Sequence, residues 1–555
     1  MITTGSETPS NLTGYSEMKR IVLISGRLCS GKSLLGKNLE QSFGFHHIKT
    51  SEILGKARTG TEASGRIALH QRGTEQDQGT EGRWVAAHIE TLIRRASDAP
   101  RYIVVDGVRS REQIDAVRAD YGSCVVHVHL TAPQEGLAMR YESRKRSGRE
   151  RSLLRYIEAD GLAVDDITAL REDADLCIDT NRSDPGDTLV RVASHLRLYS
   201  TPSHKCVDVM VGGQYGSEGK GQIAGYLAKN YDVLVRVGGP NAGHKVRSQN
   251  GTVFTYHHLP SGCKDSGADV VIGAGAVVNP ENLLGEIEAC GLTPERVFID
   301  PQAMTITEED KEEEKRLVSS IGSTGQGVGL ASARKITERW NGSTLARNDS
   351  RLAPFVNGTT TERLERAYRT NKKVFLEGTQ GSALSIHHGI YPHVTSRDTN
   401  VAGCLAEAGI SPARVRRILL VVRSYPIRVA NPSDSNDSGY MKKEISFDEI
   451  ADRSGLCAQD LKRAEKTSTT GRDRRVSEFD WELFRRSCAL NAPTDIVLTF
   501  ADYIDAKNQD AHRFDQLTPA TIQFVEELER VANAPVSLIS TRFGVRGVID
   551  RRDWW

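Results

Sequence analysis

Two glycine-rich segments constrain the fold of this chain most, because each follows a short apolar run and precedes an amphipathic stretch. The first spans residues 26–33 after the apolar run 21–24, and the second spans residues 212–221 after the run 207–211. A glycine loop between a strand and a helix is typical of a phosphate site at the carboxyl end of a parallel strand. The sequence therefore predicts two α/β domains, each with a mainly parallel sheet flanked by helices.

The length of 555 residues also indicates more than one domain, since single cores rarely exceed about 250–300 residues. Apolar runs alternate with helix-like stretches before the second loop, as expected for strands joined by crossover helices; they lie at 21–24, 102–105, 125–130 and 176–178. The expected parts are a disordered leader (1–18), a first domain (19–198), a polar linker (199–205) and a second domain (206–555). The acidic run 308–315 is interpreted as a solvated helix face.

Charge and composition argue against several classes of protein. The 73 basic and 72 acidic residues give no global attraction to nucleic acid or membrane. Nine scattered cysteines without a C-x-x-C pair are typical of reduced thiols. The N-terminus has no apolar signal region, and no run of about 18 apolar residues occurs. We therefore expect a cytoplasmic protein with neither membrane nor nucleic acid among its partners.

The first glycine loop fits the pattern G-x-x-x-x-G-K-[ST]. Backbone N–H groups of such a loop cradle phosphates, its lysine reaches the terminal phosphates, and its hydroxyl binds Mg²⁺. These roles fall to Gly26, Ser30, Gly31, Lys32 and Ser33. The pattern indicates a nucleotide and leaves the reaction open.

Two features downstream suit phosphoryl transfer. Asp106 ends an apolar run, where a carboxylate would complete the Mg²⁺ shell, and Arg109 would bind an acceptor phosphate. The basic segment 140–151, with Arg140 and Arg144, is interpreted as a lid over the transferring phosphoryl group, and a solvated basic helix is the alternative.

Together these residues resemble the nucleoside and deoxynucleoside monophosphate kinases and, more distantly, dephospho-coenzyme A kinase. The resemblance covers about residues 19–198 and implies a kinase. Its acceptor pocket is expected around Thr50, Ser51 and Arg72.

The second loop reads GGQYGSEGKG and is only partly like the first, because Gly221 stands where Ser or Thr is usual. The motifs that follow it make it specific; they are GGPNAGH (238–244), HHLPSG (257–262), GSTGQGVG (322–329), EGTQG (377–381), YPHVTS (391–396) and STTGRDR (468–474). In this order they resemble adenylosuccinate synthetase over about residues 206–550. The resemblance implies a homodimer that moves the γ-phosphate of a nucleoside triphosphate onto O6 of a purine monophosphate, from which L-aspartate then displaces phosphate.

The resemblance also implies roles for the matching residues. His244 would be the general acid at the γ-phosphate or O6, and Lys220 would neutralise phosphates. Gly243 would offer its carbonyl to Mg²⁺, and Asp502 would read the donor base. The other donor positions are Gly216, Glu218, Gly219 and Gly221. The purine monophosphate would be held by Asn241, Thr324, Gln380, Thr395 and Arg339, the last reaching a neighbouring subunit's substrate. L-Aspartate would be held by Thr469, Thr470, Arg472 and Arg474.

Ser217 departs from the family loop G-D-E-G-K-G, whose aspartate takes the N1 proton of IMP and ligates Mg²⁺. It joins His244, Lys220 and Gln380 as a catalytic candidate, but a serine hydroxyl is a poor base and a poor metal ligand. Either ligase turnover is lost or the acceptor has changed. A guanine-type base carries a 2-amino group beside N1, and a short neutral side chain leaves room for it and accepts its hydrogen bond. The sequence resembles compact viral synthetases that use (d)GMP; IMP or dIMP is the alternative acceptor.

Two departures concern the phosphoryl donor. Phe500 stands where many relatives have lysine, and Arg542-Phe543 stands where Gly-Pro is common. Both touch the donor-base pocket, so GTP and ATP or dATP all remain candidate donors.

Two functions of different class follow. The first is a bifunctional enzyme in purine nucleotide synthesis, with a ligase domain and a nucleotide kinase domain. The second is a nucleotide-sensing or regulatory module, as in phage–host conflict, in which one domain binds without turnover.

Overall fold

The computed structural model describes residues 20–56, 66–95, 100–146, 164–199, 204–248, 251–341, 344–433, 436–466 and 471–552. The leader expected over residues 1–18 lies outside these ranges. The chain divides into two compact units, Met1–Tyr199 and Ser200–Trp555. Their boundary falls at the start of the segment interpreted above as a linker.

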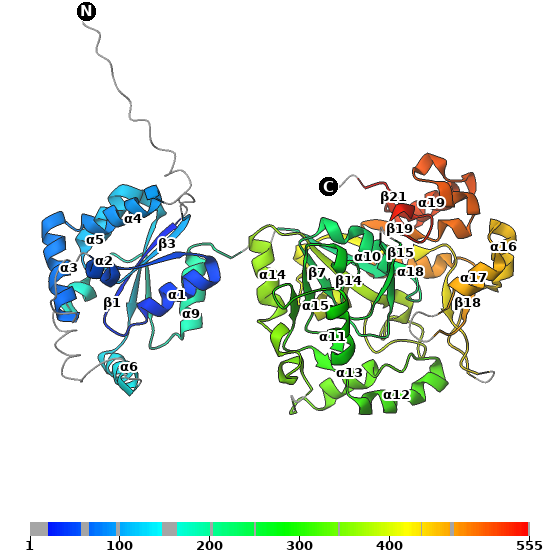
Figure 1. Ribbon diagram of the computed structural model, residues 1–555, viewed down its shortest axis with the longest axis horizontal. Coiled ribbons are helices and arrows are strands. Elements are labelled where there is room, and N and C mark those ends of the chain that lie inside the picture. The colour runs from blue at the N-terminus through cyan, green and yellow to red at the C-terminus, as the bar shows by residue number, and fades with distance from the viewer. Residues whose placement is uncertain are drawn as a thin grey trace, which may run out of the picture. The chain divides into compact units, whose positions relative to one another are not determined.

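A five-stranded parallel sheet in the order β2-β3-β1-β4-β5 forms the centre of the first unit (Figure 1). Its strands are β1 (Arg20–Gly26), β2 (His46–Lys49), β3 (Tyr102–Asp106), β4 (Val125–Thr131) and β5 (Leu176–Asp179). Each apolar run of the first domain forms a strand. Strand β2 was not predicted, because its sequence HHIK contains a single apolar residue, Ile48, which is the buried residue of the strand.

Helices cover both faces of this sheet, as apolar stripes on each helix require. Helices α1 (Lys32–Phe43) and α9 (Pro185–His195) pack on one face, and α4 (Arg83–Arg95) and α5 (Arg111–Tyr121) pack on the other. The remaining helices are α2 (Thr50–Lys56), α3 (Arg66–Thr80), α6 (Gln134–Arg146) and α8 (Val164–Ala169).

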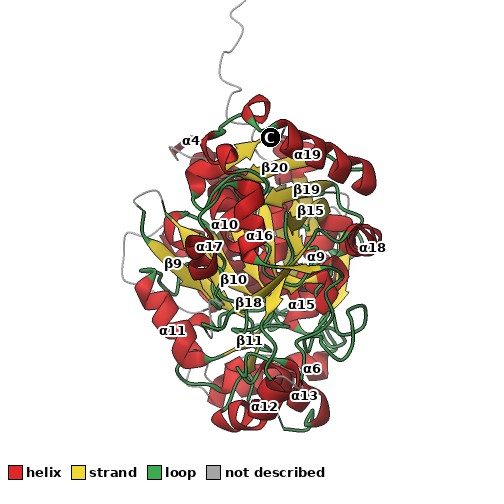
Figure 2. Ribbon diagram, turned by 90° about the vertical axis from the view of Figure 1, so that its right-hand side faces the viewer, coloured by secondary structure: helices red, strands yellow, loops and turns green. Residues whose placement is uncertain are grey.

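A nine-stranded sheet in the order β12-β10-β7-β14-β6-β15-β19-β20-β21 forms the centre of the second unit (Figures 1 and 2). All of its pairs are parallel except β20 with β21. The strands are β6 (Val207–Gly212), β7 (Val233–Arg236), β10 (Asp269–Ile272), β12 (Val297–Ile299), β14 (Val374–Gly381), β15 (Val415–Arg423), β19 (Asp495–Thr499), β20 (Val536–Ser540) and β21 (Val548–Asp550). The α/β class with a mainly parallel sheet is confirmed for both units.

Two apolar clusters fill the faces of this sheet. One packs α14 (Thr360–Arg369), α15 (Val401–Ala408), α18 (Trp481–Asn491) and α19 (Pro519–Ala532), and the other packs α10 (Lys220–Leu227) and α11 (Pro280–Ala289). The other helices are α12 (Glu308–Ile321), α13 (Val328–Thr337), α16 (Phe447–Ser454) and α17 (Ala458–Ala464). Smaller sheets pair β8 (His244–Arg247) with β9 (Val253–Tyr256), β11 (Val277–Val278) with β13 (Met304–Thr305), and β18 (Arg474–Ser477) with β16 (Ile427–Val429) and β17 (Glu444–Ile445).

The acidic run at the start of α12 is not wholly a solvated face. Asp310 is buried and pairs with Arg334, and Glu314 is buried and accepts from the backbone N–H groups of Gly327 and Gly329. The prediction failed for these two carboxylates because they anchor the glycine segment that follows, a contact that local composition does not show.

Among the described residues, no helix is long and apolar enough to cross a membrane.

Candidate active sites

The first glycine loop connects β1 to α1. Gly31 takes a left-handed φ of 102° as the N-cap of α1. Lys32 Nζ donates to the backbone carbonyls of Gly26 (2.8 Å) and Arg27 (2.9 Å), so its ammonium lies folded over the loop. Ser30 is fully buried, and its hydroxyl has no hydrogen-bond partner within the described part of the chain. Such an arrangement concentrates donors where a phosphate would lie.

Asp106 lies at the carboxyl end of β3, beside this loop. Burial would raise its pKa, but the nearby His47 ring, the charge of Lys32 and the Ser33 hydroxyl hold the pKa below its usual value; His47 Nε2 lies 3.8 Å from Asp106 Oδ2. The carboxyl group is therefore ionised and close to the Ser33 hydroxyl. A carboxylate and a hydroxyl beside phosphates suit Mg²⁺, which takes its other ligands from water and substrate.

A cavity of about 520 Å³ opens next to Asp106, and Thr50, Gly107 and Arg109 line it. Arg109 Nη1 lies 3.3 Å from His70 Nδ1, and Thr50 donates to the Gly107 carbonyl at 3.0 Å. Ser51 and Arg72, which the sequence analysis placed in an acceptor pocket, are not among the lining residues. Asp77, Trp84 and Gln113 line it instead; Asp77 accepts from Trp84 Nε1 (2.7 Å) and from Gln113 Nε2 (2.9 Å).

Arg140, in the segment interpreted as a lid, contacts the first glycine loop. It is part of α6, and its guanidinium donates to the Thr180 hydroxyl (2.9 Å), the Thr180 carbonyl (2.6 Å) and the Cys29 carbonyl (3.4 Å). Arg140 therefore ties the first glycine loop to the end of β5. The side chain of Arg144 and all of Arg149 and Arg151 lie outside the described part of the structure.

The second site forms where parallel strands of the nine-stranded sheet end together. The glycine loop follows β6, Gln380 lies near the end of β14, Arg423 ends β15, and the segment 500–502 follows β19. Gln380 and Phe500 both have left-handed backbones, with φ of 65° and 56°. Non-glycine residues in this conformation cluster at functional sites, because the surrounding structure must stabilise them.

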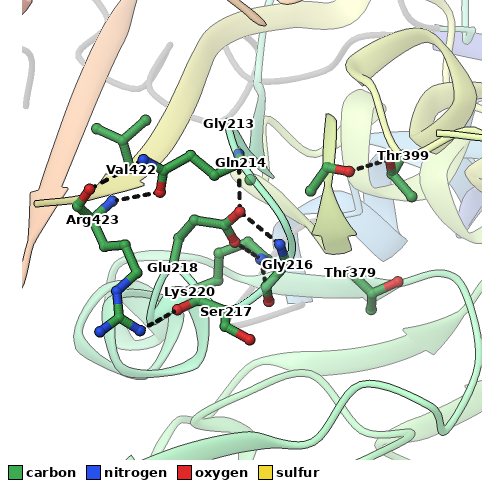
Figure 3. A network of polar contacts seen from close by, with 12 residues as sticks. Gly213, Gln214, Gly216, Ser217, Glu218, Lys220, Thr379, Thr399, Val422 and Arg423 are labelled. Atoms are coloured by element: carbon green, nitrogen blue, oxygen red, sulfur yellow. Dashed lines mark hydrogen bonds and ion pairs between the residues drawn. The ribbon is translucent and has the colours of Figure 1, made fainter. Parts of the chain in front are cut away.

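The lysine of the second loop is held by a carboxylate of the same loop (Figure 3). Lys220 Nζ lies 2.5 Å from Glu218 Oε2 and donates to the Gly216 carbonyl at 3.1 Å. Glu218 Oε1 accepts from the N–H groups of Gln214 (3.0 Å) and Gly216 (2.8 Å), and both charged side chains are buried. Figure 3 shows the Ser217 side chain outside this network, while its carbonyl accepts from Arg423 Nη1 at 3.2 Å.

Gly221 replaces the usual hydroxyl residue for a steric reason. A Cβ at this position would lie 2.7 Å from His244 Cβ, so no larger residue fits while β8 keeps its place. The departure from the P-loop pattern thus brings the candidate histidine against the start of α10.

His244 is oriented by a buried network that the motifs do not show. Its Nδ1 lies 2.5 Å from Glu377 Oε1, which is also 2.8 Å from Arg236 Nη1 and accepts from the Ser261 hydroxyl at 2.6 Å. Burial, together with Arg236, lowers the pKa of His244 to about 4, and the pKa of Glu377 is about 2. The ring is therefore neutral at pH 7, with Nδ1–H donating to Glu377. Its Nε2 has no partner among the described residues.

Two cavities meet at this histidine, with volumes of about 400 and 770 Å³. Both are lined by Gly216, Ser217, Gly243, His244 and Arg474. A group that passes from a ligand in one cavity to a ligand in the other would therefore move past these shared residues.

The smaller cavity contains most of the residues predicted to hold a purine monophosphate. Asn241, Thr324, Gln380 and Thr395 line it, and Gln380 Nε2 donates to the Thr395 hydroxyl at 2.7 Å. The Asn241 and Gln380 side-chain oxygens are buried without a partner in the described structure, so a ligand would complete their hydrogen bonding. Arg339 does not line this cavity; it is exposed after α13, beside Trp340.

The larger cavity contains the predicted donor positions. Lys220, Gly219, Gly221 and Asp502 line it together with Phe500. Burial raises the pKa of Asp502 to about 6, and Gln509 Nε2 donates to its carboxyl group at 3.2 Å. The guanidinium carbon of Arg423 lies 3.8 Å from the centre of the Phe500 ring, a cation–π contact that places Phe500 beside the glycine loop.

Arg474, one of the predicted aspartate ligands, also has a protein partner. Its Nη1 lies 3.1 Å from Glu465 Oε2, and the other oxygen of Glu465 is 2.6 Å from Arg423 Nη2. Arg472 donates to the Ser323 carbonyl at 3.5 Å, which places it beside the loop that contains Thr324. Thr469 and Thr470 lie outside the described residues.

Sequence reasoning missed the residues that hold these groups in place. Glu377 was part of a quoted motif, but Arg236 and Glu465 were not singled out. The sequence offered little indication of these two residues, because Arg236 is simply the last residue of an apolar strand and Glu465 follows an amphipathic helix. Charged residues at strand ends in a parallel sheet would have been the feature to follow.

The Mg²⁺ site implied by the family can be tested against these residues. At the meeting point of the cavities the chain offers the neutral oxygens of Ser217 and Gly243, while the carboxylate of Glu218 is engaged by Lys220. No cluster of three acidic, histidine or cysteine side chains suited to a metal occurs among the described residues. These residues fit an ion bound mainly through substrate phosphates and water.

Comparison with known sequences gives one family. The family model for adenylosuccinate synthetase matches residues 209–342 and 341–509. The adenylosuccinate synthetase of Methanocaldococcus jannaschii is 34% identical over 353 residues, covering 62% of this chain and 96% of the relative. That of Pyrococcus horikoshii is 35% identical over 353 residues, covering 62% and 98%.

Solved structures agree with this result. The succinoaminodeoxyadenylate synthetase of cyanophage S-2L, bound to dGMP and to dATP as an energy donor, has a TM-score of 0.53 and 29% identity, covering 63% of this chain and 96% of that chain. The adenylosuccinate synthetase of Plasmodium falciparum has the same TM-score at 21% identity, covers 63% of this chain and 100% of that chain, and supports the fold alone. The chain therefore belongs to the adenylosuccinate synthetase family and is a ligase of that type.

Proposed function

We propose that the second unit joins L-aspartate to C6 of a purine monophosphate with a 2-amino group, (d)GMP or a close relative, and that IMP is the poorer acceptor. The observation that carries this proposal is the position of Ser217 where the two cavities meet. A carboxylate there would crowd a 2-amino group, whereas a hydroxyl can accept its hydrogen bond. The similarity to the cyanophage enzyme that binds dGMP supports this choice.

The reaction proceeds in two steps. The acceptor loses its N1 proton to water, and the γ-phosphoryl group of GTP, ATP or dATP moves from the β-phosphate to O6 of the acceptor, which releases the nucleoside diphosphate. The amine of L-aspartate then attacks C6, loses a proton and displaces inorganic phosphate. Mg²⁺, when bound, would neutralise charge on the donor phosphates.

His244 is the proton-handling residue at the meeting point. Its neutral ring presents Nε2 as an acceptor, and the negative charge of a bound phosphate would favour the protonated ring. Glu377 fixes the tautomer and stabilises the charge, as the carboxylate partner of a catalytic histidine does. Lys220 and the backbone of Gly216, Gly219 and Gly221 would bind the γ- and β-phosphates. Asn241, Thr324, Gln380 and Thr395 would hold the acceptor, and Arg472 and Arg474 the carboxylates of L-aspartate.

We infer that the first unit is a kinase for a related (deoxy)nucleoside monophosphate. Its glycine loop, the Ser33–Asp106 pair and the adjacent cavity with Arg109 supply a donor site, a metal site and an acceptor site. We also propose that the ligase unit forms a homodimer in which Arg339 reaches the partner's acceptor, because Arg339 is exposed beside Ile336 and Trp340, which are 66% and 84% exposed.

The test uses the full chain with GMP, dGMP, IMP or dIMP, together with L-aspartate, Mg²⁺ and each donor. Mass spectrometry should detect a succinyl adduct, with GMP or dGMP consumed faster than IMP or dIMP. Ser217→Asp should shift the ratio of kcat/KM toward the hypoxanthine acceptor by at least about tenfold, and Ser217→Ala, which keeps the space but removes the hydrogen-bond acceptor, should shift it less. No adduct with any acceptor would refute ligation; tight nucleotide binding without product would then indicate the sensing module.

A further inference from the structure

One face of helix α3 lines the cavity of the first unit. His70, Gly73, Thr74 and Asp77 all line it, and a spacing of three or four positions places them on the same side of the helix. Asp77 lies two helical turns after His70, so the two residues are roughly 10 Å apart at about 1.5 Å per residue. The cavity therefore has two ends, and α3 sets the distance between them.

The end at His70 carries a cation and lies toward the first glycine loop. Arg109 Nη1 lies 3.3 Å from His70 Nδ1. Arg109 closely follows Asp106, whose carboxyl group is affected by the charge of Lys32 in the glycine loop. An acceptor phosphate at this end would thus meet a guanidinium group on the side from which the donor phosphate arrives.

The end at Asp77 presents a carboxyl group as a hydrogen-bond acceptor. Its Oδ1 accepts from Trp84 Nε1 at 2.7 Å, and Gln113 Nε2 lies 2.9 Å from both of its oxygens. These two neutral donors orient the group and leave it capacity for further N–H groups, since a carboxylate offers about four acceptor sites. Gln113 Oε1 also accepts from the backbone N–H of Arg109 at 2.9 Å, so this side chain links the two ends.

A purine edge with adjacent N–H donors matches the end at Asp77. Guanine presents N1–H beside its 2-amino group, whereas adenine has an acceptor at N1 and hypoxanthine lacks the 2-amino group. A carboxylate accepts hydrogen bonds and donates none, so it favours guanine and disfavours an edge that places a lone pair against it. The indole of Trp84 lines the cavity at the same end and offers an aromatic surface to the base.

We propose that this cavity binds a guanine nucleoside monophosphate, with the phosphate at Arg109 and with N1–H and the 2-amino group donating to Asp77. The inference rests on the proposed kinase function of the first unit and adds the base that it accepts and the residue that selects this base. In the transfer, a phosphate oxygen of the acceptor attacks the γ-phosphorus of the donor, whose bond to the β–γ bridging oxygen breaks, so that the donor leaves as a nucleoside diphosphate. The two units would then act on the same class of base.

The experiment compares acceptors in the full chain with ATP and Mg²⁺. L-Aspartate is left out and His244→Asn is present in every sample, so that ligation does not consume the acceptor. Mass spectrometry measures the diphosphate formed from GMP, dGMP, IMP and AMP, and kcat/KM for GMP and dGMP should exceed that for IMP and AMP by at least about tenfold. Asp77→Asn should lower kcat/KM for GMP about 10- to 100-fold and for AMP by less than about threefold, because the new amide presents N–H groups to the base.

Two further variants separate base selection from folding. Asp77→Glu keeps the carboxylate and should retain the preference for GMP over AMP. Asp120 gives the matched control, since it accepts from Arg83 Nη2 at 2.9 Å in the same unit and does not line the cavity. Asp120→Asn should leave the ratio of kcat/KM for GMP over AMP unchanged. Pulse proteolysis in urea shows whether each first unit is folded and how much GMP or AMP stabilises it, which measures binding without transfer.

The outcomes distinguish this inference from the kinase proposal. Transfer to GMP, IMP and AMP at equal rates, or an equal loss of all three in Asp77→Asn, would overturn the inference and retain the kinase. A GMP preference that survives in Asp77→Asn would also overturn it. No transfer to any monophosphate, while GMP stabilises the first unit in a manner that requires Asp77, would refute the kinase and retain the guanine site. Neither transfer nor stabilisation by GMP would refute both.

Discussion

The two glycine loops share a backbone plan and differ in how their lysines are held. Each follows a buried parallel strand and ends in a left-handed glycine that caps a helix, Gly31 in the first unit and Gly219 in the second. Lys32 donates to two carbonyls of its own loop, whereas Lys220 is bound by the buried carboxylate of Glu218. The two loops therefore have the same backbone geometry but different electrostatic surroundings for their lysines.

The two loops therefore differ in the partner of their lysine: backbone carbonyls in the first loop and a carboxylate in the second. In the first loop the two hydrogen bonds of Lys32 run to neutral carbonyls, and its charge also acts on Asp106. In the second, Lys220 is paired with the buried carboxylate of Glu218, so removing either partner would leave a buried charge unpaired. Each prediction below either separates the two loops or shows them to be alike.

The largest expected effect is on chemistry in one unit only. His244→Asn should lower kcat for ligation by roughly 10²–10⁴, because it removes the group that we propose handles protons at the meeting point of the cavities. Phosphorylation by the first unit should be unchanged, and Lys32→Met should give the opposite pattern. Both rates are measured on the same preparations by mass spectrometry of the products. Loss of both activities in either variant would show that the sites are coupled.

The second prediction concerns stability. Lys220→Met should destabilise the second unit by about 3–5 kcal/mol, because it leaves Glu218 buried and unpaired. Lys32→Met should destabilise the first unit by less, about 1–2 kcal/mol, since its two hydrogen bonds are to neutral backbone carbonyls. Pulse proteolysis in urea, with fragments assigned to each unit by mass, measures both. The double change Glu218→Gln with Lys220→Met should recover part of the loss; no recovery would mean that Lys220 acts through packing.

The sequence predicted those parts of both sites that lie in short motifs. Asn241, Gln380, Thr395 and His244 were predicted from such motifs, and the structure places them around one cavity. The charge partners were not predicted. Arg236 and Glu377 are 141 positions apart, and only the adjacency of β7 and β14 brings them to His244.

Two further features could not be inferred from the local sequence. Arg140 contacts Thr180 and Cys29, which hold it to the first loop, and the basic lid over residues 140–151 stays a prediction. The strand β2 was missed because it lies at the sheet edge, where one buried apolar residue suffices. Tertiary contacts between distant segments decided each of these outcomes, and composition could not reveal them.

The third prediction is that acid weakens the first unit more than the second. Burial lowers the pKa of His127 and of His129 to about 4, with Arg118, Asp173 and Asp175 near His127 and Lys32 and Arg171 near His129. The unfolded chain takes up these protons near pH 6.5, so stability is lost as the pH falls. Each histidine should account for about 1.4 kcal/mol between pH 7.5 and 5.5.

The second unit should lose less folding stability between pH 7.5 and 5.5. His244, with a pKa of about 4, acts in the same direction, as does His258, whose pKa burial also lowers. Asp502 opposes them, because its raised pKa of about 6 means that the folded state gains a proton there. Urea pulse proteolysis at each pH resolves the two units. His129→Gln should flatten the dependence of the first unit only; equal slopes in both units would contradict the assignment.

The smallest effect compares the two capping glycines. Gly31→Ala should cost about 1 kcal/mol, because an L side chain is strained at a φ of 102° while its Cβ meets only Leu130 Cδ1 at 4.0 Å. Gly219→Ala should cost more, since its Cβ would also lie 3.3 Å from Phe500 Cε2. Urea unfolding of each unit measures the difference, and Phe500→Leu in the Gly219→Ala background should reduce it. If Gly219→Ala costs the same with Phe500 and with Leu at position 500, Phe500 does not press on the loop. The two loops would then differ in the charge partner of their lysine and not in their packing.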